Sequence, residues 1–188
     1  MSLAELKDRP FELLLELERL ARLASAARDG GATAADEWTG IGFRIGAEHF
    51  VTGRGDVREV LPIPEPLTRV PGSRAWLRGI ANVRGQLLTV VDLKAFLGVG
   101  GSALDRRSRV LVAASREVPT ALIVEEVVGI RRFARSDFKQ DVPMPLLGCD
   151  RYLDGGFVQG SEVWRRFNLD KLLGDERFLN AGDVAGRK

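Results

Sequence analysis

The spacing of apolar residues divides the chain into two parts. Near the N-terminus, Leu13, Leu17 and Leu20 follow one another at intervals of four and three residues. This spacing places their side chains on one face of an α-helix. A proline in the first turn and two glycines after the last apolar position are typical start and stop signals. The pattern predicts an amphipathic helix over residues 8–29 and a short linker over residues 30–37.

From Trp38 onward the apolar period changes to two. Ile41, Phe43 and Ile45 alternate with glycine or arginine, and a turn over residues 46–49 leads into a second apolar stretch. Alternation at every second residue is the pattern of a half-buried β-strand. A β domain therefore begins here.

Further strands follow at short intervals, and glycine or proline separates most of them. They are predicted over residues 57–61, 86–93, 109–114, 121–130, 157–159 and 163–169. Strands of this length and spacing are typical of a barrel or a sandwich. Three helical pieces are expected: a turn at residues 74–77, a helix over residues 92–97 closed by Gly98, and a last helix capped by Asp170 and ending at Leu173.

Length and composition favour one main globular domain. The chain has 188 residues, of which 45% are hydrophobic and 29% charged. Its apolar runs are far shorter than the roughly 20 residues that span a bilayer, so membrane insertion is not expected. The single cysteine, Cys149, cannot form an intramolecular disulfide, which fits a reducing compartment. We expect a cytoplasmic protein in which Cys149 is a small buried residue.

Basic residues are concentrated in the middle of the chain. Eight basic and two acidic residues lie between Arg69 and Arg109, although the whole chain has a net charge of only +2. Nucleic-acid binding would use a basic face for phosphates, but it normally brings exposed aromatic residues or a recognition helix, and neither is evident. We therefore expect a solvated or protein-facing surface and no nucleic-acid partner.

Residues that could carry chemistry do not form a catalytic, cofactor or metal site. His49 is the only histidine and lies in the predicted hairpin turn, so neither a catalytic triad nor a zinc site can be assembled around it. The sequence G-x-G-x-x-A at residues 98–103 follows a helix and precedes a strand, which is the wrong context for a dinucleotide loop. The Arg-Gly-Asp sequence at residues 54–56 is interpreted as a turn. Glu125 and Glu126 are expected to face opposite sides of one strand.

The segment W-L-R-G-I-A-N-V-R-G-Q-L-L-T-V-V-D-L-K-A-F-L-G at residues 76–98 carries a recognisable motif. Its landmarks are Gly79, Asn82, Arg84, Gly85 and the pair Asp92-Leu93. The motif resembles the signature of CheW-like domains, in which a short helix leads into a G-x-x-N-x-R-G hairpin, a hydrophobic strand and a small helix. Residues 57–60 and 121–129 extend the resemblance, which covers residues 38–179. The start at residues 38–43 and the helical extension look most like the PilI branch of type IV pilus systems.

The resemblance implies a mainly β fold of two intertwined five-stranded SH3-like β-barrels with an N-terminal α-helical extension. It divides the chain into an extension and linker (1–35), a CheW-like domain (36–180) and a tail (181–188). The implied function is that of a non-catalytic adaptor between the helical tip of a methyl-accepting chemoreceptor and the regulatory domain of a CheA-type histidine kinase. Its place would be at receptor arrays on the inner membrane face. The alternatives are a flagellar chemotaxis adaptor and a groove-binding small-ligand sensor.

The residues expected to bind protein partners surround the Arg84-Gly85 turn. Gly85 supplies the free backbone of a tight hairpin, which holds the long Arg84 side chain at a defined place on the surface. If the strands pair as the family implies, Arg84 can reach Glu59. The predicted protein-binding residues are Val57, Glu59, Asn82, Val83, Arg84 and Gly85. For the two valines, a core position and a groove lining are equally compatible with the sequence.

Deletion of residues 1–35 tests where the apolar face of the predicted helix is buried. An isolated helix of this length is marginal in water, so it either folds back on the β domain or binds a neighbouring protein. Burial of three leucines stabilises by about 5 kcal/mol before ordering costs. If the helix folds back, thermal denaturation of the truncated protein should give a melting temperature several degrees lower. An unchanged melting temperature together with lost partner binding would make the helix an interaction element.

Overall fold

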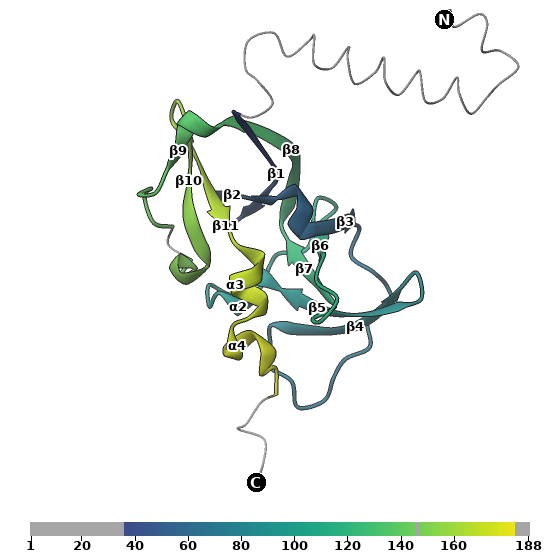
Figure 1. Ribbon diagram of the computed structural model, residues 1–188. Helices are drawn as coiled ribbons and strands as arrows, with labels where there is room; N and C mark the ends of the chain where they lie inside the picture. Colours follow the sequence, from purple (N-terminus) through teal and green to yellow (C-terminus); the bar gives the residue numbers. More distant parts are fainter. Residues whose placement is uncertain (1–35, 146, 183–188) are drawn as a thin grey trace, which may run out of the picture. The chain divides into compact units, whose positions relative to one another are not determined.

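The computed structural model describes residues 36–145 and 147–182 (Figure 1). The predicted helix over residues 8–29, nearly all of the linker and the last six residues of the tail lie outside the described residues. The predicted domain bounds at residues 36, 180 and 181 stay predictions.

Two β-sheets form the domain. The first has six strands in the order β8-β1-β2-β11-β10-β9, and the second has five in the order β3-β6-β7-β5-β4 (Figure 1). The first sheet contains β1 (Glu37–Ile45), β2 (Glu48–Gly53), β8 (Glu126–Ala134), β9 (Phe138–Lys139), β10 (Leu153–Gln159) and β11 (Glu162–Phe167). The second contains β3 (Val57–Leu61), β4 (Leu77–Val83), β5 (Gln86–Asp92), β6 (Arg109–Ala113) and β7 (Thr120–Val124).

The chain interleaves the two sheets. It enters the six-stranded sheet with β1 and β2, builds the whole five-stranded sheet, and returns to the first sheet with β8. The return is completed by β11, which pairs in parallel with β2 so that His49 lies opposite Trp164. This topology confirms the predicted mainly β fold of two intertwined sheets. The first sheet has six strands instead of five because the two-residue strand β9 pairs with β10.

The central core lies between the two sheets. Phe43 and Phe50 come from the six-stranded sheet, Leu111 and Leu122 come from the five-stranded sheet, and Leu172 comes from a C-terminal helix. The opposite face of the five-stranded sheet encloses a second cluster, formed by Ala81, Leu88, Val90, Val110, Val112, Ala121 and Ile123. Every residue of β7 is buried, because this strand contributes side chains to both cores.

Short helical segments connect the strands. They are α2 (Leu93–Phe96), α3 (Leu169–Leu173), α4 (Glu176–Leu179) and the 3-10 turns η2 (Arg54–Asp56), η3 (Arg135–Asp137) and η4 (Asp150–Tyr152). The buried Asp92 carboxylate caps α2 by accepting from the Ala95 N–H at 3.2 Å, and it also accepts from the N–H and hydroxyl of Ser102 at 3.0 and 2.7 Å. The glycine-rich segment is therefore a loop that Asp92 holds, as its sequence context predicts.

Several predicted element bounds are wrong. The strand expected over residues 121–130 is two strands in different sheets, and strand β4 (Leu77–Val83) begins already at Leu77, within the helical turn expected at residues 74–77. That turn is a single hydrogen bond from the Leu77 N–H to the Arg74 carbonyl at 2.9 Å. Asn168, not Asp170, caps α3, because its side chain accepts from the N–H three positions later, at Lys171.

Two leucines in the five-stranded sheet offer a matched test of the core. Leu122 is fully buried in β7, whereas Leu87 in β5 is 65% exposed. Leu122→Ala should lower the free energy of unfolding by about 2–5 kcal/mol, and Leu87→Ala should change it by less than about 0.5 kcal/mol. Urea denaturation monitored by tryptophan fluorescence measures both. Equal losses in the two variants would contradict the assignment of Leu122 to the core.

Candidate protein-binding site

The hairpin between β4 and β5 has the tight turn that the sequence predicts. Arg84 and Gly85 both adopt positive φ angles, 51° and 82°, which is the pattern of a type I′ turn. The Asn82 side-chain carbonyl accepts from the Gly85 N–H at 2.9 Å, and Val83 lies opposite Gln86 across the turn. The Asn and Gly of the motif therefore fix the turn, and the arginine itself occupies one of its two strained positions.

Arg84 reaches Glu59, as predicted. Its Nη1 atom lies 3.0 Å from Glu59 Oε2. Glu59 belongs to β3, at the opposite edge of the five-stranded sheet from β4. A second contact joins β3 to the first residue of β5, because Arg58 Nη1 lies 2.5 Å from Gln86 Oε1. The sheet therefore curls until side chains link its edge strand β3 to the β4–β5 hairpin.

The Arg84–Glu59 pair is a surface feature and contributes little to folding. The Arg84 side chain is 77% exposed and that of Glu59 is 18% exposed. Ion pairs of this kind are worth about 0–1 kcal/mol. A guanidinium has five N–H donors, so most of those on Arg84 remain available to a partner. Glu59 orients Arg84 without covering it.

Leu87 adds an apolar element to this surface and was not among the predicted residues. It lies directly opposite Asn82 in the strand register, so the two exposed side chains are on the same face of the hairpin. No sequence signal distinguishes it, because Leu87 and Leu88 are adjacent leucines and only the fold shows that Leu88 is the one that points into the core. The hairpin thus presents a cation and an isolated large apolar side chain together.

The two valines of the predicted site differ in burial. Val57 is 7% exposed and belongs to the central core, so its role is that of a core residue that supports β3. A bulge between Val57 and Glu59 then turns the Glu59 side chain toward the hairpin. Val83 is half-buried and packs against the second cluster, so it lies at the rim of the candidate surface.

The expectation that Glu125 and Glu126 face opposite sides of one strand is wrong. Strand β7 ends at Val124 and strand β8 begins at Glu126, so Glu125 lies between two strands. Both carboxylates contact Arg44, Glu125 at 3.4 Å and Glu126 at 3.1 Å. Glu125 also accepts from Lys94 Nζ at 2.7 Å and from the Gly46 N–H at 2.6 Å. Burial opposes ionisation of Glu125, but these donors outweigh it and lower its pKa. The pair is an anchor for the strand crossover.

The other residues that could carry chemistry, Cys149 and His49, are packed within the domain. Burial, together with the nearby Asp150 carboxylate, raises the pKa of the Cys149 thiol to about 12, so the prediction of a small buried residue is confirmed. His49 lies in β2, not in the turn, and its ring packs against Trp164 at 4.8 Å. Within residues 36–145 and 147–182 there is no group of three or more His, Cys, Asp or Glu side chains that could hold a metal ion.

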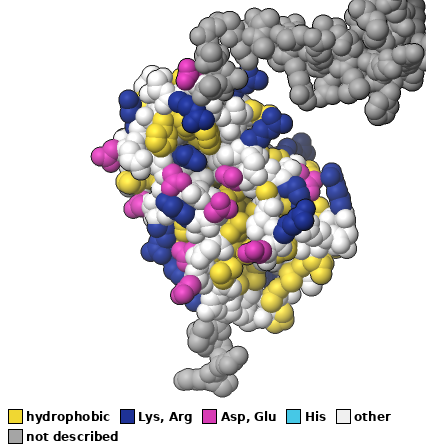
Figure 2. All heavy atoms as spheres, in the orientation of Figure 1, with side chains coloured by type: hydrophobic (Ala, Val, Ile, Leu, Met, Phe, Trp, Pro, Cys, Tyr) yellow, Lys and Arg dark blue, Asp and Glu magenta, His cyan; other side chains and the backbone are white. Residues whose placement is uncertain are grey.

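Charges on the surface are mixed. On the face drawn in Figure 2, Lys and Arg side chains are dispersed among acidic side chains instead of forming one continuous basic stripe. Among the described residues, no helix is long and apolar enough to cross a membrane.

The two interleaved, curled sheets define a mainly β domain of the SH3-like type, and comparison with known proteins identifies its family. The family model described as a CheW-like domain matches residues 39–177, and the chain belongs to this family. It is 36% identical to Protein PilI of Pseudomonas aeruginosa over 171 residues, which are 91% of this chain and 95% of PilI. It is 31% identical to Protein FrzA of Myxococcus xanthus over 137 residues, covering 70% of this chain and 82% of FrzA.

A solved structure has the same fold. The crystal structure of the scaffolding protein TtCheW from Thermoanaerobacter tengcongensis superposes with a TM-score of 0.66 and covers 79% of this chain and 94% of its own. The two sequences are 19% identical, so the likeness concerns the fold. It supports the predicted CheW-like arrangement of two SH3-like units.

The Glu125 anchor should make stability depend on pH. Because the pKa of Glu125 is lower in the folded state, its contribution is present above the unfolded pKa of about 4.3 and is lost as the pH falls through the folded pKa. Glu125→Gln should cost about 1–3 kcal/mol at pH 7. The difference in the free energy of unfolding between this variant and the unmodified protein, measured by urea denaturation, should shrink toward pH 3. Glu126→Gln, which removes a contact to Arg44 alone, should cost less. A constant difference at every pH would contradict the role of the charge.

Proposed function

We propose that this protein is a non-catalytic adaptor that couples methyl-accepting chemoreceptors to a CheA-type histidine kinase in a type IV pilus chemosensory system. The observation that carries the proposal is the β4–β5 hairpin, where an exposed guanidinium is held by a type I′ turn and oriented by Glu59. Its occurrence in a chain of the CheW-like family supports a docking role.

The chemistry of the hairpin suits a helical protein partner. Arg84 provides N–H donors for carboxylates or for carbonyl groups at a helix end. Leu87 provides an apolar side chain that is 65% exposed and would be covered by the partner. Interfaces typically combine an apolar centre with polar contacts around it, and arginine is enriched at their strongest positions. The helical tip of a chemoreceptor is the partner that the family resemblance implies.

The other proposed binding residues act around Arg84. Glu59 sets the direction of the guanidinium, and Asn82 with Gly85 holds the turn. Val83 contributes a half-buried apolar rim, and the buried Val57 supports β3 beneath Glu59. Loss of any of these residues would displace the arginine even where the residue itself does not touch the partner.

The kinase would bind a different surface, through its CheW-like regulatory domain, since an adaptor must hold receptor and kinase together. Resemblance to PilI favours control of pilus extension and twitching motility, with the protein located in the cytoplasm at receptor arrays. A flagellar chemotaxis array is the alternative output. A groove-binding sensor of small ligands is the alternative class.

Substitution of Arg84 tests the docking surface. Arg84→Ala should weaken binding to a cytoplasmic receptor fragment at least tenfold, which corresponds to about 1.4 kcal/mol, because it removes the oriented donors. Isothermal titration calorimetry measures the affinity. The melting temperature should hardly change, because an exposed pair contributes about 0–1 kcal/mol to folding.

Arg116→Ala is the matched control, because Arg116 is an exposed arginine in the β6–β7 connection. It should bind the receptor fragment as the unmodified protein does. Unchanged affinity in Arg84→Ala would reject the assigned role of the hairpin. A pull-down from the native organism with mass spectrometry should recover receptor and kinase together, and recovery of neither would favour the sensor alternative.

A further inference from the structure

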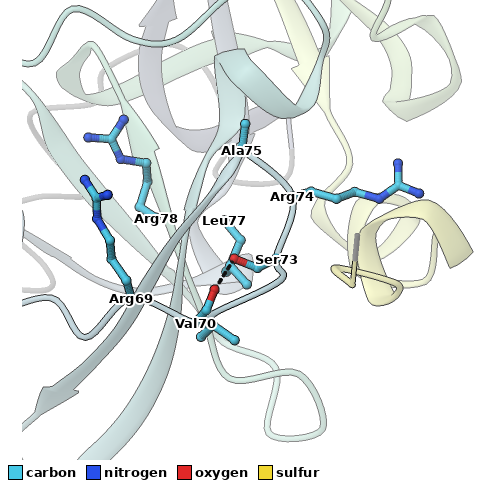
Figure 3. Close-up of a pocket in the computed structure, with 7 residues that line it drawn as sticks. All are labelled: Arg69, Val70, Ser73, Arg74, Ala75, Leu77 and Arg78. Atoms are coloured by element: carbon cyan, nitrogen blue, oxygen red, sulfur yellow. Dashed lines mark hydrogen bonds between the residues drawn. The ribbon is translucent and has the colours of Figure 1, made fainter. Parts of the chain in front are cut away.

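A second charged feature lies at the other end of β4. Arg78 lies near the start of β4 and Arg84 lies in the turn that follows the strand, six residues later, a separation of about 20 Å at ~3.3 Å per residue. Arg78 lines a cavity of about 320 Å³ together with Arg69, Ser73 and Arg74 and the apolar residues Val70 and Leu77 (Figure 3). Among the residues that the structure describes, none that lines this cavity, here called the Arg69–Arg78 pocket, is acidic.

The positive charge of the pocket is only partly compensated. Residues 66–91 contain four arginines and no Asp or Glu. Within residues 36–145 and 147–182, no hydrogen bond or ion pair involves the guanidinium of Arg69. The nearest carboxylate to Arg78 is that of Asp92, 3.9 Å from Nη1, and it already accepts three shorter hydrogen bonds. Asp92 is thus the one carboxylate within ion-pair distance of Arg78 among the described residues, and Arg69 has none there.

The two arginines extend together. Figure 3 shows the side chains of Arg69 and Arg78 pointing in the same direction, whereas Arg74 points away from them. Arg74 is engaged elsewhere, because its Nε donates to the Gly182 carbonyl at 3.4 Å. The pocket therefore presents a pair of guanidinium groups. Their mutual repulsion would be relieved by an anion bound between them.

The loop that carries Arg69 is fixed on both sides. Thr68 and Ile80 exchange two backbone hydrogen bonds of 2.9 and 2.8 Å, which tie the loop to the edge of β4. The Ser73 hydroxyl donates to the Val70 carbonyl at 2.7 Å, and the Arg74 N–H donates to the Ala181 carbonyl at 2.9 Å. A ligand would therefore order little backbone when it binds, which favours affinity.

We propose that the Arg69–Arg78 pocket binds carboxylates of an acidic segment in a protein partner. Guanidinium groups match carboxylates with two parallel hydrogen bonds. A small pocket with apolar Val70 and Leu77 at its wall suits one or two Asp or Glu side chains with their aliphatic stems. Nucleic acids instead need a stripe of cations along successive phosphates. The site is separate from the Arg84 hairpin, goes beyond the proposed adaptor function and does not depend on it.

A titration with hexaglutamate peptide tests the pocket. Backbone amide signals of the ¹⁵N-labelled full chain should show saturable shifts at Val70 and Ser73, weakened when the sodium chloride concentration is raised from about 50 to about 200 mM. The double variant Arg69→Gln/Arg78→Gln should raise the dissociation constant at least tenfold. Arg106→Gln/Arg107→Gln removes the same charge from an exposed turn and should change it less than twofold. Arg69→Gln alone keeps the Arg78–Asp92 contact and should give an intermediate loss.

Equal weakening in both double variants, or no saturable shifts with the peptide, would overturn the proposal. So would arginine-dependent binding of inorganic phosphate, single-stranded DNA or vesicles of anionic lipid in place of the peptide. The peptide titration is independent of the adaptor function, because that function is tested by the receptor affinity of Arg84→Ala, which changes the hairpin at the other end of β4. If the unmodified protein binds hexaglutamate but binds no receptor, the proposed adaptor function is rejected and the pocket proposal stands.

Discussion

The fold depends on the crossover at which the chain leaves the five-stranded sheet and rejoins the six-stranded one. Glu125 stands at this point and receives hydrogen bonds from Gly46 in the first hairpin and from Lys94 in α2, with Arg44 completing its surroundings. One carboxylate thus ties together segments that belong to both halves of the domain. Its charge is stable there because the donors outweigh the cost of burial.

The same junction sets the geometry of the binding surface. Because β7 is buried on both faces, the five-stranded sheet must curl around one core while it packs on the other. The curl brings β3 near the β4–β5 hairpin, where Glu59 meets Arg84. Their ion pair is therefore a result of the packing and not a cause of it. At the opposite end of β4, the loop that crosses its edge places Arg69 beside Arg78.

Local features were predictable because their signals lie within a few residues. Gly85 indicated the turn, and the alternation from Ile41 to Ile45 indicated β1. Asn168 could also have been recognised as a cap, since its partner is three residues away. The end of one strand and the start of the next at Glu125 could not have been predicted. The residues on both sides of Glu125 favour strands, and only their pairing with distant strands places them in different sheets. The basic stretch was visible in the sequence. That Arg69 and Arg78 line one pocket could not be predicted, because it depends on the fold.

The parallel pairing of β2 with β11 has a consequence for synthesis on the ribosome. His49 and Trp164, which face each other across these strands, are separated by most of the domain in sequence. Until β8 and β11 have been translated, the β1–β2 hairpin exposes both of its outer edges and the aromatic side chains that later enter the core. Open strand edges of this kind are sites of aggregation, and distant contacts form slowly. The nascent chain therefore carries an incomplete sheet, with unpaired strand edges, through most of its elongation.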